Sequence, residues 1–231
     1  MDACLVLFSG GLDSTTALYW ARHRYEIVHP LSFDYGQRHR VELDMAAATA
    51  ARLGLEPVRL NVDLTPIGGS ALTDPRIPVP KSDRPPGPGF GSPPTYVPFR
   101  NGIFLSLAAA WAEPRGIQDL VCGFHTSDSP DYPDTRPEFV AAMERALRAG
   151  TYSDLKGRPL RIVAPFLHEK KSAIIRLGLE LGADYSYSIS CYDGGEVPCR
   201  ACPACRLRQR AWEEVGRTDP LLARLEKEGK L

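Results

Sequence analysis

The sequence lacks a net charge, a long hydrophobic run and a secretory signal. Its 28 basic and 28 acidic residues cancel, whereas domains that bind nucleic acids over a broad surface are usually strongly basic. No apolar stretch approaches the ~20 residues that span a bilayer. The start, Met1 to Cys4, has neither the basic region nor the cleavage pattern of a signal peptide. We therefore expect a cytoplasmic protein with no membrane partner and no stable nucleic-acid partner.

The composition is otherwise that of a globular domain, apart from the placement of its proline. Hydrophobic residues make up 43% and charged residues 24% of the 231 positions, which excludes a disordered chain. The length suits one domain, or one domain with a small appendage. Nine of the 21 prolines fall within residues 75–98, so this segment predicts a long loop. A surface excursion and a lid over a pocket both fit such a loop.

Strand-like and helix-like segments alternate through residues 1–190. Short apolar runs that end at turn residues predict strands at 4–8, 27–33, 58–62, 120–122 and 160–164. The segments between them predict helices at 12–22, 41–53, 101–112, around 139–147 and at 171–181. Asn101 is expected to cap the third helix, and Thr135 with Glu138 has the spacing of a capping box before the fourth. The alternation predicts an α/β fold with an open parallel Rossmann-like sheet of about five strands and helices on both faces.

Residues 9–15, S-G-G-L-D-S-T, connect the first predicted strand to the first predicted helix. Ligands of open α/β folds collect at this carboxyl edge of the sheet. The glycines let the backbone approach an anion, and hydroxyl groups and N–H groups of the first helical turn can donate to phosphate oxygens. Asp13 suits an anion site if a cation such as Mg²⁺ lies between it and the phosphate. The string matches neither the Walker nor the dinucleotide fingerprint, and a tight turn with a helix cap is the simpler alternative.

The string S-G-G-L-D-S at residues 9–14 resembles the pyrophosphate loop of the PP-loop ATP pyrophosphatases, which carry it after the first strand. Members of that superfamily cleave ATP between its α and β phosphates and adenylate a carbonyl or carboxylate oxygen. The resemblance implies that ATP and Mg²⁺ bind this loop and its helix, at Phe8, Ser9, Gly10, Gly11, Leu12, Asp13, Ser14, Thr15, Thr16, Ala17 and Leu18.

Four of the six cysteines lie close together with the spacing C-x7-C-x2-C-x2-C, at Cys191, Cys199, Cys202 and Cys205. Two-residue gaps let the backbone aim thiolates at one point, and four thiolates at ~2.3 Å form a closed structural zinc site. We predict one structural Zn²⁺ per chain in a small extension with a helical tail, residues 191–231. An iron–sulfur cluster, a redox-active pair and disulfides are the alternatives. The other two cysteines, Cys4 and Cys122, are expected in the core.

Polar residues are dense between the fourth and fifth predicted strands. The segment 123–138 also opens onto the carboxyl edge of the sheet, and its charged residues include Asp128, Asp131, Asp134, Arg136 and Glu138. Carboxylates there could accept hydrogen bonds from a guanine-like base, and Arg100 or Arg136 could hold a substrate carboxylate. A solvated loop with helix caps explains the same composition.

Several strings together resemble one family, the 7-cyano-7-deazaguanine synthases of queuosine precursor biosynthesis. They are S-G-G-L-D-S-T-T at 9–16, S-F-D-Y-G-Q-R-H at 32–39, V-P-F-R-N at 97–101, Y-P-D-T-R-P-E-F at 132–139, P-F-L-H-E-K-K at 165–171 and the cysteine cluster. They lie in the family's order and span about residues 4–210. Phe99 stands where the family usually has glycine, and Thr135 where it usually has cysteine.

The resemblance implies an ATP-dependent ligase that converts 7-carboxy-7-deazaguanine and ammonia to the nitrile through adenylated carboxylate and amide intermediates. It implies catalytic roles for Asp13, Ser14 and Lys171, of which the lysine would stabilise charge at the α-phosphate. It also implies substrate recognition by Arg100, Asn101, Asp131, Asp134, Arg136 and Glu138.

Two other classes compete with this interpretation. An RNA-thiolating enzyme of the same superfamily would need a cysteine in the pocket and a basic face, and Cys122 is the candidate cysteine. A zinc-ribbon interaction module without turnover is the non-enzymatic alternative, which the intact phosphate loop disfavours. The sequence is compatible with a homodimer and does not identify the ammonia source.

Overall fold

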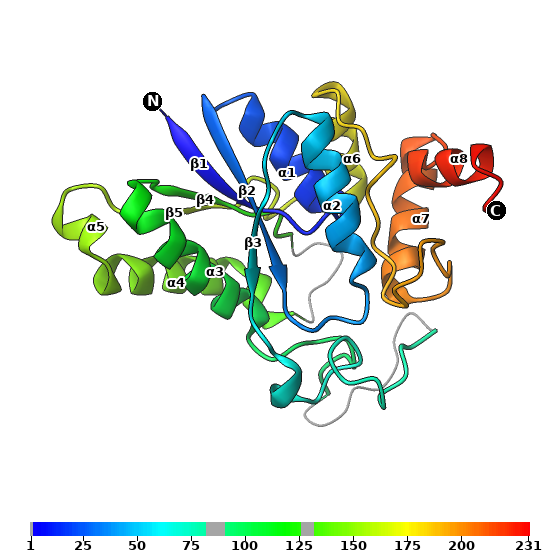
Figure 1. Cartoon of the computed structure of the whole chain (residues 1–231), viewed down its shortest axis with the longest axis horizontal. Helices are drawn as coiled ribbons and strands as arrows, with labels where there is room; N and C mark the ends of the chain where they lie inside the picture. Colours follow the sequence, from blue (N-terminus) through cyan, green and yellow to red (C-terminus); the bar gives the residue numbers. More distant parts are fainter. Residues whose placement is uncertain (1, 82–90, 126–131) are drawn as a thin grey trace.

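The structure, a computed structural model, describes residues 2–81, 91–125 and 132–231. Its five strands, all parallel, are β1 (Ala3–Leu7), β2 (Ile27–Asp34), β3 (Val58–Asn61), β4 (Asp119–Val121) and β5 (Arg161–Val163). They form one sheet in the order β3-β2-β1-β4-β5 (Figure 1). In the central strand, Leu5 pairs with His29 on one side and Leu120 on the other. The predicted open parallel sheet is confirmed.

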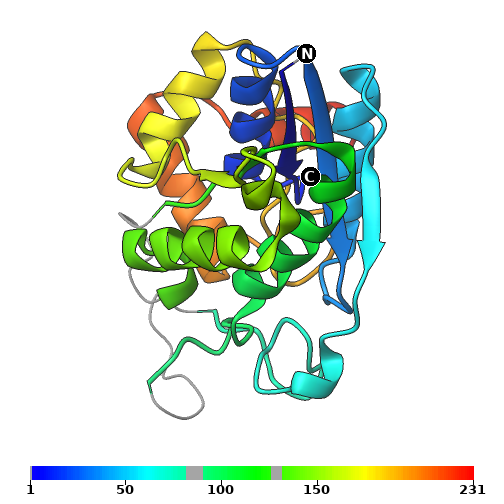
Figure 2. The same ribbon diagram turned by 90° about the vertical axis from the view of Figure 1, so that its left-hand side faces the viewer.

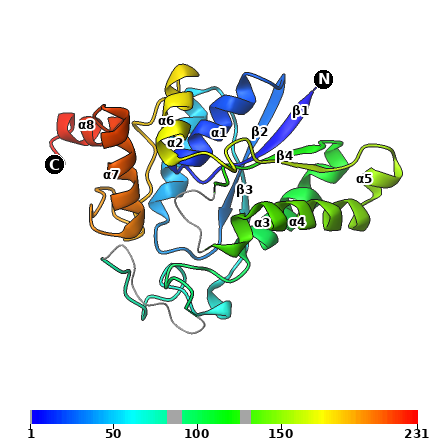
Figure 3. The same ribbon diagram turned by 180° about the vertical axis from the view of Figure 1, so that it is seen from behind.

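Helices cover both faces of the sheet, as expected for parallel strands joined by crossovers (Figure 3). The helices of four or more residues are α1 (Leu12–Arg22), α2 (Val41–Arg52), α3 (Arg100–Ala112), α4 (Pro137–Gly150), α5 (Tyr152–Leu155), α6 (Lys171–Glu180), α7 (Pro203–Val215) and α8 (Pro220–Lys227). One buried cluster joins the sheet to α1, α2, α6 and α7, with Leu18 and Ile174 among its members. The other joins the opposite face to α3 and α4 through Leu105 and Met143. No helix of the described residues has the length and apolarity needed to cross a membrane.

The start of α3 differs from the sequence prediction. The helix begins at Arg100, so Asn101 lies inside it and is not the N-cap. Its backbone N–H donates to the Asp134 carboxylate at 3.0 Å, and its side-chain amide donates to the Asp134 carbonyl at 3.1 Å. Phe99 occupies the N-cap position in the left-handed region, with φ of 52°. That backbone conformation favours glycine, which gives a physical reason for the glycine usual in the family.

The capping box predicted before α4 is wrong as well. Thr135 lies in a short 3-10 helix, η3 (Pro133–Thr135), where its hydroxyl donates to the Tyr132 carbonyl at 2.9 Å. The helix starts at Pro137 after Arg136, which makes no side-chain cap. Proline at the first helical position has no N–H to satisfy, so one of the donors that a cap serves is absent.

The C-terminal extension packs against the rest of the chain. Helix α7 lies beside α6 (Figure 2), and α8 lies at the outer edge of the molecule (Figure 1). A third apolar cluster joins the cysteines to Ala71, Val79 and Leu221. The division of the chain at residue 190 stays a prediction.

The described ends of the proline-rich segment approach the sheet edge. The backbone N–H of Ala71 donates to the Pro94 carbonyl at 2.7 Å, which ties residues 91–98 to the loop after β3. Residues 82–90 lie outside the described residues, so the lid interpretation remains a prediction.

Candidate active site

A cavity of about 670 Å³ opens at the carboxyl ends of β1, β2 and β4. The chain leaves β1 for the β2 side, and the strand order reverses between β1 and β4. Open α/β sheets bind ligands at such a switch point, because the loops diverge there. The predicted phosphate loop, the end of β4 and the start of α6 all contribute to the walls.

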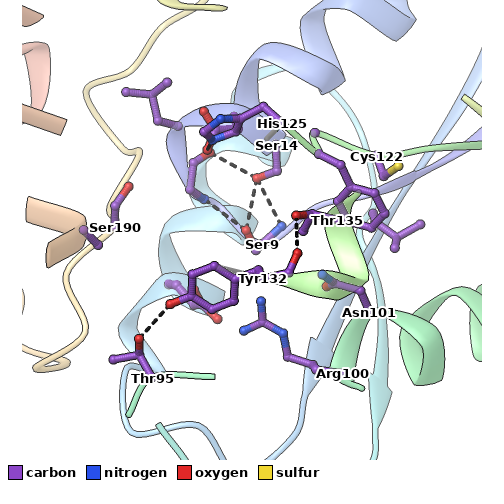
Figure 4. A pocket seen from close by; sticks show the side chains of 18 of the residues that line it. Ser9, Ser14, Thr95, Arg100, Asn101, Cys122, His125, Tyr132, Thr135 and Ser190 are labelled. Atoms are coloured by element: carbon purple, nitrogen blue, oxygen red, sulfur yellow. Dashed lines mark hydrogen bonds and ion pairs between the residues drawn. The ribbon is translucent and has the colours of Figure 1, made fainter. Parts of the chain in front are cut away.

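The phosphate loop is held by hydrogen bonds between its own hydroxyl groups (Figure 4). The Ser9 and Ser14 hydroxyls lie 3.2 Å apart, and the Ser14 hydroxyl donates to the Gly11 carbonyl at 3.0 Å. Gly10 has a φ of +77°, and a Cβ there would lie 2.6 Å from the backbone oxygen of Glu42. Only glycine therefore lets this loop rest on α2 in its present form.

Asp13, His125 and Lys171 meet beside the loop. The Lys171 ammonium donates to the two Asp13 oxygens at 2.9 and 2.6 Å, and His125 Nε2 lies 3.4 Å from the ammonium and 3.5 Å from Asp13 Oδ2. Burial alone would raise the pKa of Asp13, but the charges of Lys171 and His125 lower it below its usual value. Asp13 is therefore ionised and can bind a cation. Gly123, just after β4, lets the phosphate loop approach closely, because a Cβ at this position would lie 2.8 Å from the Asp13 backbone.

Some of the predicted ATP-loop residues line this cavity and others do not. Those that line it are Phe8, Ser9, Gly11, Leu12, Asp13 and Ser14. Those that do not are Gly10, Thr15, Thr16, Ala17 and Leu18. The Thr15 hydroxyl donates to the Gly11 carbonyl at 2.9 Å, and the Thr16 hydroxyl lies 2.6 Å from that of Tyr185 in the core. These side chains support the loop from behind.

A second part of the cavity is lined by aromatic rings and by Arg100. Its guanidinium donates to the Tyr35 hydroxyl at 3.2 Å and points into the cavity (Figure 4). The Phe33 and Phe104 rings stack at 4.1 Å between centroids. The Tyr132 hydroxyl lies 2.7 Å from that of Thr95, which joins the segment after residue 91 to the loop before α4. Such flat apolar walls with a few polar groups suit a heterocyclic ligand.

Only some of the described residues that were predicted to recognise the substrate line the cavity. Arg100 and Asn101 line the cavity. Asp134 is 4% exposed and binds the first turn of α3, whereas Arg136 and Glu138 are exposed and do not line the cavity. Asp128 and Asp131 lie outside the described residues.

Sequence reasoning missed several residues that line the cavity. His125 follows β4 and Tyr35 follows β2, so both lie at the carboxyl edge of the sheet. The signal in the sequence that could have identified them is their position directly after a predicted strand. Glu42 and His39 also line the cavity and are largely buried. They lie near the start of α2, in a segment whose sequence reads as an ordinary charged first turn.

The four cysteines of the extension converge. Their Sγ atoms all lie within 4.8 Å of one another, close to the ~3.8 Å between thiolates around one zinc ion at 2.3 Å. The backbone N–H of Cys199 donates to Cys191 Sγ, and that of Cys202 donates to Cys199 Sγ, each at 3.3 Å. Such N–H donors stabilise thiolate ligands. The cluster fits a metal site with a complete set of four ligands.

The remaining cysteines occupy the core of the sheet. Cys4 and Cys122 are both fully buried. Cys122 borders the cavity at the end of β4, and burial raises the pKa of its thiol to about 12. A thiol with this pKa is protonated at neutral pH and is a poor nucleophile.

Comparisons with known proteins agree over most of the chain. A family model described as "Queuosine biosynthesis protein QueC" matches residues 3–216. A 7-cyano-7-deazaguanine synthase of Nitrosococcus oceani is 48% identical over 94% of this chain and 96% of its own length. The enzymes of the same name from Acinetobacter baylyi and Thiobacillus denitrificans are 48% and 47% identical, over 94% and 95% of this chain and 93% and 98% of their own lengths.

Among solved structures, a 4-thiouridine synthetase–RNA complex with bound ATP is similar with a TM-score of 0.49 and 18% identity, over 99% of this chain and 53% of that one. A likeness this distant does not assign an activity. The family model and the relatives together cover the phosphate loop, the cavity and the cysteine cluster. The chain therefore belongs to the QueC family of queuosine biosynthesis proteins.

Proposed function

We propose that this chain synthesises 7-cyano-7-deazaguanine from 7-carboxy-7-deazaguanine, ammonia and ATP. Membership of the family supports the reaction, and the three relatives are named 7-cyano-7-deazaguanine synthases. The observation that carries the proposal is the Asp13–Lys171 pair, which joins the phosphate loop to the start of α6 and faces a cavity of about 670 Å³. A cavity of that size suits small-molecule substrates.

The reaction has two activation steps. The substrate carboxylate attacks the α-phosphorus of ATP and releases diphosphate; ammonia then displaces AMP, with loss of a proton, and leaves the amide. The amide oxygen attacks a second ATP in the same way. Loss of AMP and the remaining N–H protons converts the adenylated amide to the nitrile.

The residues around the loop would act mainly by positioning and charge neutralisation. The hydroxyls of Ser9 and Ser14 and the N–H groups at the start of α1 would donate to phosphate oxygens. Asp13 offers a carboxylate of the type that Mg²⁺ prefers, and Mg²⁺ bound there would neutralise phosphate charge. Lys171, released from Asp13 as the nucleotide enters, would donate to the α-phosphate. Arg100 and Asn101, which line the cavity, would contact the deazaguanine. Recognition by Asp131, Asp134, Arg136 and Glu138 stays a prediction.

We further propose that the cysteine cluster holds one Zn²⁺ with a structural role. All four positions of a tetrahedral ion would be filled by Cys191, Cys199, Cys202 and Cys205, which leaves no position for a substrate. Metal analysis of the purified protein should give about one zinc per chain. An absorption band of an iron–sulfur cluster would contradict the assignment.

The decisive experiment is product analysis after incubation with ATP, ¹⁵N-labelled ammonium and 7-carboxy-7-deazaguanine. The expected products are the nitrile with one ¹⁵N, AMP and diphosphate, and omission of ammonium should stop the reaction after adenylation. Absence of both nitrile and amide would contradict the proposal. RNA thiolation, the alternative, is disfavoured by the protonated thiol of Cys122. Homodimer formation and the lack of a stable nucleic-acid partner stay predictions.

A further inference from the structure

Glu42 presents a carboxyl group to the cavity that the roles described so far do not use. Its side chain is 13% exposed, and it lines the same cavity as Arg100 and the phosphate loop. Gln37 donates to Oε1 at 3.2 Å, and His39 Nε2 lies 3.4 Å from Oε2. Each carboxylate oxygen has two lone pairs, so each can accept one more hydrogen bond from a ligand.

The Glu42 carboxyl group lies in surroundings that favour its neutral form. Burial raises its pKa to about 8, against the opposing effects of the Arg100 charge and the Gln37 hydrogen bond. His39 is 6% exposed, and its Nδ1 atom has no hydrogen-bond partner among the described residues. The side chain of Glu42 does not cap α2, which has no side-chain cap. Ionising a buried carboxyl group costs free energy, and N–H groups of a ligand that donate to it would offset that cost.

The neighbours of Glu42 indicate which ligand would do so. The charge of Arg100 acts on Glu42, and the same guanidinium contacts Tyr35 in the aromatic part of the cavity. An acceptor pair beside a donor, between aromatic walls, is complementary to the edge of a guanine-type ring. That edge carries N1–H and an exocyclic amino group as adjacent donors, with the O6 acceptor next to them.

We propose that Glu42 accepts hydrogen bonds from N1–H and the exocyclic amino group of the deazaguanine, while Arg100 donates to O6. The inference rests on the proposed function, because it assigns the specificity of the same cavity. Adenine presents an acceptor at N1 beside its donor at N6, so it cannot donate to both oxygens of an ionised Glu42, whereas the two adjacent donors of the deazaguanine would favour the ionised carboxylate on binding. Glu42 therefore selects the deazaguanine against adenine-type rings.

The test combines one variant with one substrate analogue. Glu42→Gln keeps the size of the side chain but exchanges one acceptor oxygen for a donor. The analogue, 7-carboxy-7-deazahypoxanthine, lacks the exocyclic amino group. A charge-assisted hydrogen bond contributes about 1.5–3 kcal/mol, so the wild type should lose roughly 10–100-fold in kcat/KM with the analogue. Glu42→Gln should lose a similar factor with the natural substrate, through KM, and should then lose less than threefold more with the analogue.

The matched control is Glu56→Gln, a change at an exposed glutamate beyond the end of α2, which should reproduce the wild type with both substrates. Equal analogue penalties in the wild type and Glu42→Gln would overturn the inference. So would a raised KM for ATP with an unchanged KM for the deazaguanine, since Glu42 would then contact the nucleotide. Wild-type turnover of the natural substrate separates the two proposals. Absence of wild-type turnover overturns both the proposed function and the role of Glu42. Turnover with equal analogue penalties in the wild type and Glu42→Gln overturns only the role of Glu42.

Discussion

The cysteine cluster takes its four side chains from residues 191–205, whereas the charged site beside the phosphate loop takes Asp13, His125 and Lys171 from the segments that follow three different strands, β1, β4 and β5. Asp13 and Lys171 are 158 positions apart in the chain. In the cluster, short spacing and backbone N–H donors bring the ligands together. In the charged site, the order of the parallel strands does so.

The two regions also differ in what they leave open. Four thiolates complete the shell of one metal ion, so the cluster can stabilise the fold without binding a substrate. Asp13, His125, Lys171 and Glu42 instead line the cavity, where a ligand can contact them. The regions are linked, however, because α7 begins directly after Cys202 and its residues Pro203, Ala204, Leu207 and Arg210 line the cavity. Substitutions in the cysteine cluster should therefore lower mainly the stability, and substitutions in the charged site mainly the activity. Helix α7 is the element that contacts both regions.

The largest effect is expected from loss of the metal. Cys202→Ser should lower zinc content well below one per chain and strongly lower the melting temperature, because a structural zinc site contributes of order 10 kcal/mol to folding. Metal analysis and calorimetry check this. Cys4→Ala, at a buried cysteine outside the cluster, should keep full zinc content. Unchanged zinc content in Cys202→Ser would remove the distinction between the two regions.

In contrast to Cys202→Ser, Asp13→Asn should lower the catalytic activity and leave the zinc content unchanged. Loss of the carboxylate removes the proposed Mg²⁺ ligand, so kcat/KM should fall by about 10³-fold or more, equivalent to ~4 kcal/mol. The zinc content should stay near that of the wild type. Asp44→Asn, at an exposed aspartate on α2, is the control and should keep full activity. Full activity of Asp13→Asn would rule out the proposed role.

Lys171 and its neighbour allow a matched pair of variants. Lys171→Met removes the ammonium beside Asp13 and should lower kcat by about 10²–10³-fold, the range seen when one transition-state donor is lost. Lys170→Met changes an exposed lysine at the preceding position and should leave kcat within about twofold. Steady-state kinetics with saturating ATP checks both. Similar losses in the two variants would indicate a general effect of charge and not a contact with the phosphate.

The smallest effect concerns the pH dependence of stability. The pKa of Glu42 is about 8 in the folded protein, against an ordinary value of 4.5. Between these values the unfolded chain loses a proton that the folded chain keeps, so the free energy of unfolding falls as the pH rises from about 4.5 to about 8. Glu42→Gln removes this term and should gain roughly 2–4 kcal/mol relative to the wild type between pH 5 and pH 9. Urea unfolding of both proteins at several pH values checks this prediction. A difference in the free energy of unfolding that does not change with pH would contradict the burial of an uncompensated carboxyl group.

Much of the fold followed from local patterns. The alternation of apolar runs and helical segments predicted five parallel strands, and α1 has the same bounds, residues 12–22, as the prediction. The errors occurred where a long-range contact replaced a local one. Asn101 was expected to cap α3, but its backbone N–H binds Asp134, which comes from a segment 33 residues away. No local spacing carries that information.

The same division holds for the site. Five strings between residues 9 and 171, together with the cysteine cluster, predicted the family, which is confirmed. The cysteine spacing predicted a cluster whose geometry fits a metal site. Density of charge between β4 and β5 was a weaker guide. Arg136 and Glu138 are exposed and lie outside the cavity wall, while the less conspicuous His125 and Glu42 form part of it.

The sequence by itself determined the strands and helices, the phosphate loop and the cysteine cluster, because each depends on residues that are neighbours in the chain. Only the tertiary structure decided that Lys171 and His125 meet Asp13, and that Glu42 faces the cavity beside Arg100. The physical reason is the strand order β3-β2-β1-β4-β5. It selects which segments share one edge of the sheet, and burial and neighbouring charges there set the pKa values of the groups that a substrate can contact.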